Sequence, residues 1–261
     1  MEHCGPTDEL GYHFPIDIEE IYTSSGQLVP GKRALIKKDT NKILTLISDR
    51  YLYKPFHKTV DEVKNLFAGL GISDTSVYVS SSNLNLAITG DFRCLAREAF
   101  TDVKLNMFLV ARRNYKTRCP SPDLYMGCTI DKGKGGWLLH EDPITKYHTE
   151  MGTCYAENKI IKEWERSSDI WSSLSQFAYP YERMEKALGM GIDSVIPRSD
   201  GRALVRGLKI NAEDQVSVFE VYQAVAKYIA DEKCTTFETK IKKQRLLSKF
   251  INIKFHLPRE V

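Results

Sequence analysis

Two kinds of hydrophobic periodicity occupy different parts of this chain, and this separation restricts the fold more than any other feature. Between residues 33 and 130, apolar residues occur in short β-type runs, of which Lys104–Arg112 (KLNMFLVAR) is apolar enough to be a central strand. From Met151 onward, apolar residues recur three and four positions apart, as on one face of a helix. Strands followed by helices predict an α+β fold, in which an antiparallel sheet is packed by helices from the C-terminal half.

The strands are expected to pair as hairpins. Arg33–Lys38 and Lys42–Ser48 are separated by Asp39-Thr40-Asn41, residues that favour a tight turn. Ser76–Ser80 and Leu84–Thr89 are a second candidate hairpin. These pairs predict that the sheet is built from hairpins of the N-terminal half. Leu124–Ile130 is expected to pair beside the central strand, and Cys94–Phe100 to be a short helix or turn.

Helix starts and ends are predicted from capping residues. Thr59 followed by Glu62 forms a capping box, and Asn211 is a candidate N-cap for a long helix. Arg198–Gly207 is interpreted as a loop with a short strand. The expected helices are Thr59–Leu70, Met151–Phe177, Tyr181–Met190, Asn211–Glu232 and Thr239–Ile251.

Length and composition indicate one domain inside a cell. Residues 1–30 contain three prolines and little apolar sequence, which predicts an irregular N-terminal wrap over a single α+β domain of residues 31–261. The chain has neither a secretory start nor an apolar run of about 20 residues, so no membrane contact is expected. The predicted location is the cytoplasm, that of the host cell if a phage encodes the chain, with the six cysteines reduced.

Positive charge is concentrated in two segments. Residues 111–137 contain six basic and two acidic residues, and residues 232–261 contain eight basic and three acidic residues, although the whole chain has a net charge of only +3. Such asymmetry attracts polyanions locally. The candidate nucleic-acid-binding residues are Arg112, Arg113, Tyr115, Lys116, Arg118, Lys132, Lys134, Lys240, Lys242, Lys243 and Arg245.

These candidates have distinct expected roles. Basic side chains after the central strand would neutralise phosphates, and Tyr115 would stack on an unpaired base. Lys132 and Lys134 lie in a glycine-rich stretch that lacks P-loop spacing. These two lysines would close over the bound nucleic-acid strand. The C-terminal candidates belong to a basic amphipathic helix. Each segment also has a structural interpretation without a binding role. The segment after the central strand would be a solvated charged loop, the glycine-rich stretch a mobile turn, and the C-terminal segment an ordinary closing helix.

No residue pattern indicates an enzyme, a cofactor or a metal. Candidate zinc ligands lack the spacing of structural sites, no motif supports a Cys–His protease dyad, and the acidic residues that would serve a magnesium-dependent nuclease have no distinctive spacing. The zinc candidates are Cys119, Cys128, His140, His148 and Cys154; the acidic candidates are Asp91, Asp102, Asp131, Glu141 and Asp142.

The segment Arg33–Tyr51, with its Asp-Thr turn, a strand ending in Ile-Ser, and then Arg-Tyr, resembles the opening of the phage/plasmid-like protein family of unknown function. Thr59–Leu70 is similar to the helix that follows in that family, and Val216–Ile229 is similar to the late helix of the family. The central Asn-Ser-x-x-Gly-Ser segment of the family is missing from this chain. Asp131–Gly136 is the nearest segment to it by position. The resemblance implies a mobile-element context.

We therefore expect a non-enzymatic protein that binds nucleic acid, preferably single-stranded, in phage recombination or replication, by analogy with single-strand annealing proteins. The alternative is a phage protein-binding factor, a host-defence inhibitor or structural accessory, that contacts a protein through its basic C-terminal helix. A homo-oligomer is a further possible assembly.

Overall fold

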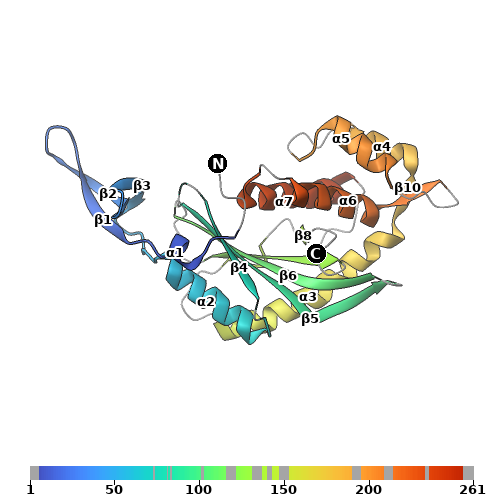
Figure 1. Cartoon of the computed structure of the whole chain (residues 1–261), viewed down its shortest axis with the longest axis horizontal. Coiled ribbons are helices and arrows are strands. Elements are labelled where there is room, and N and C mark those ends of the chain that lie inside the picture. Colours follow the sequence, from blue (N-terminus) through green and yellow to red (C-terminus); the bar gives the residue numbers. More distant parts are fainter. Residues whose placement is uncertain are drawn as a thin grey trace.

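The fold is α+β, as the separated periodicities predict, and every strand pairing is antiparallel (Figure 1). The structure is a computed structural model that describes residues 6–72, 74–80, 82, 84–100, 103–115, 122–130, 137–139, 143–146, 153–189, 195–208, 214–232 and 235–254.

The largest sheet has the strand order β4-β5-β6-β7-β8, with β9 also paired to β7. Its strands are β4 (Thr75–Val79), β5 (Asn85–Phe100), β6 (Val103–Asn114), β7 (Asp123–Ile130), β8 (Trp137–Leu139) and β9 (Thr145–Lys146). The prediction of a central strand near residues 104–112 is confirmed by β6, and β7 pairs beside it. The expected helix or turn at Cys94–Phe100 is wrong, because β5 continues to Phe100 and pairs with β6.

Helices cover both faces of this sheet. Figure 1 shows α2 (Phe56–Gly69) and α3 (Thr153–Ser173) on one side, and α6 (Val218–Asp231) and α7 (Phe237–Lys254) on the other. Successive β6 residues point to opposite faces, and Leu109 and Val110 are both fully buried. Two buried faces explain why this strand is almost continuously apolar.

Helix α2 begins earlier than the capping box predicted. Its N-cap is Pro55, which makes no side-chain cap hydrogen bond, and Thr59 lies buried within the first turns. Phe56 is only 1% exposed and packs on the ring of Tyr115, so burial of this aromatic side chain sets the helix start.

The first thirty residues are more regular than predicted. Strand β1 (Ile16–Tyr22) pairs with β2 (Leu28–Lys37), which pairs with β3 (Lys42–Ser48), and α1 (Glu9–Tyr12) precedes them. The hairpin around the Asp-Thr-Asn turn is confirmed, and Asn41 takes the left-handed conformation with φ of 52°. These three strands form a separate sheet at one end of the molecule, on the left in Figure 1. The expected irregular wrap is therefore wrong.

The remaining elements lie between α3 and α7. They are the 3-10 helix η2 (Leu174–Gln176), β10 (Ala178–Pro180), α4 (Tyr181–Gly189), α5 (Arg198–Arg206) and β11 (Gln215–Ser217). The expected loop at Arg198–Gly207 is instead α5, whose Val205 is buried. Asn211 lies outside the described residues; α6 starts at Val218, where Ser217 and Glu220 form a capping box.

Candidate binding surface at the end of strand β6

The structure describes seven of the eleven candidate nucleic-acid-binding residues. Three lie at the end of β6 and four lie on α7. The remaining four, Lys116, Arg118, Lys132 and Lys134, lie outside the described residues.

Arg112 and Arg113 are adjacent in sequence but lie on opposite faces of the sheet, because side chains alternate along a strand. Arg113 is only 2% exposed. It donates hydrogen bonds to the backbone oxygen of Lys54 at 2.6 Å and to Oγ1 of Thr59. The expectation that Arg113 holds a phosphate at the surface is therefore wrong. Its guanidinium joins β6 to the start of α2.

Tyr115 is also internal. It is 1% exposed, and its ring stacks on Phe56 with centroids 4.1 Å apart and planes 2° apart. Burial raises the pKa of its hydroxyl, since the phenolate would lose its hydration. The expected stacking of Tyr115 on a nucleic-acid base is wrong for this fold, because both ring faces are occupied or covered by protein.

Arg112 faces the layer of α6 and α7. Its guanidinium forms an ion pair with Glu238 in the first turn of α7. The end of β6 and the start of the C-terminal helix, more than 120 residues apart in sequence, therefore meet in space. This contact brings together two of the basic segments that the sequence singled out.

A groove lies where these elements meet. It encloses about 460 Å³, including space open to solvent, between the ends of β4, β5 and β6 and the start of α7. Tyr78 and Phe237 stack along it with ring centroids 3.8 Å apart. Its polar lining consists of Ser80, Asn85, Arg112, Thr236 and Glu238. Sequence reasoning missed this groove, because Tyr78 and Asn85 belong to strands that carried no functional pattern.

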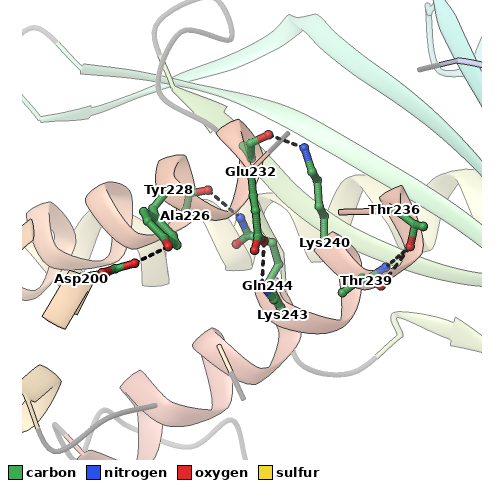
Figure 2. A network of polar contacts seen from close by, with 10 residues as sticks. Asp200, Ala226, Tyr228, Glu232, Thr236, Thr239, Lys240, Lys243 and Gln244 are labelled. Atoms are coloured by element: carbon green, nitrogen blue, oxygen red, sulfur yellow. Dashed lines mark hydrogen bonds and ion pairs between the residues drawn. The ribbon is translucent and has the colours of Figure 1, made fainter. Parts of the chain in front are cut away.

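Helix α7 is anchored by polar contacts as well as apolar ones. Figure 2 shows Gln244, whose Nε2 donates to the backbone oxygen of Ala226 at 3.0 Å. One turn further on, Ser248 hydrogen-bonds Tyr222, which donates to the backbone oxygen of Leu139 at 3.1 Å. Both Gln244 and Ser248 are buried. The helix is thus part of the core, and its inward face is less apolar than the expected amphipathic pattern.

The basic residues of α7 are partly engaged by neighbours. Lys240 donates to the backbone oxygen of Ala230 at 2.5 Å, and Lys243 pairs with Glu232 at 2.6 Å (Figure 2). Arg245 lies over the ring of Tyr125, 4.6 Å from its centroid. Lys242 is exposed.

Charge pairing leaves a positive excess on this helix. Six of the residues in α7 are basic and one, Glu238, is acidic. Burial favours the protonated form of Glu232, but hydrogen bonds from Lys243 and Thr235 and the charges of Lys243 and Lys240 outweigh it and lower its pKa. The ion pairs therefore reduce the positive field of α7 without removing it.

The candidate metal ligands are not brought together in the part of the chain that the structure describes. Cys119, His140 and His148 lie outside it, as do Asp102, Asp131, Glu141 and Asp142. Cys128 is fully buried in β7, where burial raises the pKa of its thiol. Asp91 accepts a hydrogen bond from Thr129 at 3.1 Å. Among the described residues, no three His, Cys, Asp or Glu side chains form a group that would hold a metal ion.

These features define the class as an α+β protein with a groove at one end of its main sheet. Comparison with protein-family models, curated proteins and solved structures finds no match to the chain. The resemblance to the phage/plasmid-like family therefore stays a prediction. Among the described helices, none combines the length and apolar character needed to cross a membrane.

Proposed function

We propose that this chain binds single-stranded nucleic acid along α7 and the adjoining end of β6. The observation that carries the proposal is the contact between Arg112 and Glu238, which joins two segments with an excess of basic residues on one face of the sheet. The predicted mobile-element context suggests a role in recombination or replication.

The residues that would take part in binding differ from those that the sequence predicted. Lys242 and the other basic residues of α7 would neutralise phosphates and release counterions. Tyr78 and Phe237, half-buried at the groove, offer ring surface to a base in place of the buried Tyr115. The binding site would therefore lie on the α6–α7 side of the main sheet.

The test is fluorescence anisotropy of a labelled oligonucleotide of about 20 bases, measured at several salt concentrations. Each phosphate that the protein contacts on a single strand contributes about −0.7 to the slope of log affinity against log salt concentration. The double variant Lys242→Glu, Lys249→Glu should weaken binding at least about tenfold, since it reverses two charges on the proposed surface.

The matched control is Lys58→Glu, Lys159→Glu, which makes the same change in net charge at exposed lysines of α2 and α3, on the other side of the sheet. This variant should retain nearly all of the affinity. Undetectable binding of the wild-type chain at low salt, or equal losses in the two double variants, would contradict the proposal. Deletion of residues 240–261 is unsuitable here, because α7 supplies buried residues to the core.

A second candidate function, binding of a protein, is favoured by a different region. Ile43 and Leu46 on β3 are 59% and 58% exposed, although apolar side chains of this size are usually covered. The positive charge of α7 plays no part in this candidate, whose contact would be the β1–β2–β3 sheet instead of the basic helix.

A further inference from the structure

The basic residues of α7 are divided between two faces of the helix. Lys242, Arg245 and Lys249 follow one another three and four positions apart, so they lie along a single face. Lys242 and Lys249 are exposed, and Arg245 is half-buried. We call these three residues the outer row. They present a line of positive charge parallel to the helix axis.

The other two lysines in the first half of α7 face α6 instead. Lys240 donates to the backbone oxygen of Ala230, and Lys243 pairs with Glu232 at the C-terminal end of α6 (Figure 2). The buried Gln244 contacts α6 on the same side. Lys240 and Lys243 are therefore part of the contact between the two helices.

The outer row is joined to the main sheet through Tyr125 of β7. Arg245 lies over the ring of Tyr125, which is 2% exposed. Burial raises the pKa of the Tyr125 hydroxyl, and the positive charges of Arg245 and Arg112 counteract this rise. Two arginines that come from α7 and from β6 therefore converge on one tyrosine. Their fields add, and this strengthens the attraction for an anion at that point.

Two carboxylates accompany these cations. Asp123 is opposite Arg112 in the register of β6 and β7, and Glu238 pairs with Arg112. Glu238 also lies one turn before Lys242, on the face of the outer row. Arg112 and the three residues of the outer row outnumber the two carboxylates, so the surface keeps a net positive charge.

We infer that a bound single strand lies along the axis of α7 and contacts this helix through the outer row, with no contact to Lys240 or Lys243. This inference rests on the proposed function and specifies which charges carry it. The row extends from Lys242 to Lys249, about 10 Å at a rise of 1.5 Å per residue. A stacked strand advances about 3.4 Å per nucleotide, so the row faces about four successive phosphates. The ligand is thus a short single-stranded segment.

The salt dependence of binding tests which charges contact phosphate. Lys242→Gln, Arg245→Gln and Lys249→Gln should each make the slope of log affinity against log salt concentration less steep by about 0.7, and weaken binding at least about threefold. Lys243→Gln is the matched control, because it makes the same change in charge on the same helix at a residue that faces α6. Its slope should equal that of the wild type.

Two measurements on the wild-type chain need no substitution. In acetylation with a limiting amount of reagent, read by mass spectrometry, a bound oligonucleotide should protect Lys242 and Lys249. Lys58 and Lys159, which are exposed on α2 and α3, should react as before. The salt slope should also be the same for oligonucleotides of about 8 and about 20 bases, since the row faces only about four phosphates.

The circular dichroism spectrum of each variant establishes that it is folded. A wild-type chain that binds no oligonucleotide at low salt would remove both the proposed function and this inference. Three results would overturn the inference while binding itself stands. They are a loss of slope in Lys243→Gln equal to that of the row variants, a steeper slope for about 20 bases than for about 8, and protection of Lys58 and Lys159 to the same extent as Lys242.

Discussion

Replacement of Arg113 by methionine tests whether this residue holds the fold together instead of binding a ligand. Methionine keeps most of the volume of the buried stem but removes the charge and every donor. The guanidinium of Arg113 donates to the backbone oxygen of Lys54 at 2.6 Å and to Thr59, with a longer contact of 3.5 Å to Pro55. Its central carbon also lies 5.3 Å from the ring centroid of Tyr115.

The expected magnitude comes from two opposing effects. Each buried acceptor left without a partner costs about 1–3 kcal/mol, and Arg113→Met leaves two strong contacts unmade. Removal of the buried charge offsets part of this destabilisation, because burial of an ion costs several kcal/mol of desolvation free energy, which methionine does not incur. We therefore expect Arg113→Met to lower the free energy of unfolding by about 1–3 kcal/mol. Arg113→Ala should lose more, roughly 2 kcal/mol beyond that, because it also leaves a cavity.

Urea denaturation followed by circular dichroism measures these differences. Arg33→Met is the matched control, because Arg33 is exposed and its loss should change the free energy of unfolding by less than about 0.5 kcal/mol. Under native conditions, folded Arg113→Met should bind an oligonucleotide within about twofold of the wild type, since a buried side chain contacts no phosphate. An Arg113→Met chain with wild-type stability and no oligonucleotide binding would refute this reasoning.

Two further predictions concern packing and titration. Gly127→Ala should lower the free energy of unfolding by about 1–3 kcal/mol or more, because a Cβ there would lie 2.0 Å from the backbone oxygen of Leu138. Gly207→Ala, whose nearest contact is 3.4 Å, is the control for urea denaturation. Hydrogen bonds from Tyr228 and Ser199 lower the pKa of Asp200. This interaction stabilises the fold above the unfolded pKa of about 3.9 and is lost as the pH falls, so Tyr228→Phe should raise the pKa of Asp200 in an NMR titration.

Local patterns predicted the β2–β3 hairpin of the small sheet and the central strand of the main sheet. The hairpin at residues 33–48 and the central strand β6 were predictable, because turn residues and continuous apolar runs act over a few positions. Strand β1 was missed because its alternation of apolar and acidic residues lies among prolines and glycines. Helix α5 was missed because its stability comes from packing, with Gly201 against Leu188 of α4, and not from a long apolar stripe.

The candidate site depended much more on the tertiary structure. The excess of basic residues near residue 112 and after residue 232 is a property of the sequence and is unchanged by folding. The sequence does not determine which of the two adjacent arginines is buried. Alternation along a strand assigns them to opposite faces, but it does not say which helix covers which face. Packing against Phe56 buries Tyr115 and draws Arg113 inward.

Composition and periodicity along the chain were thus enough to establish an α+β fold, a central apolar strand and two basic segments, because these depend on neighbours in the sequence. The burial of Arg113 and Tyr115 and the contact of Arg112 with α7 arose only when distant segments packed together. Each is set by contacts between residues tens to more than a hundred positions apart, which no local pattern encodes.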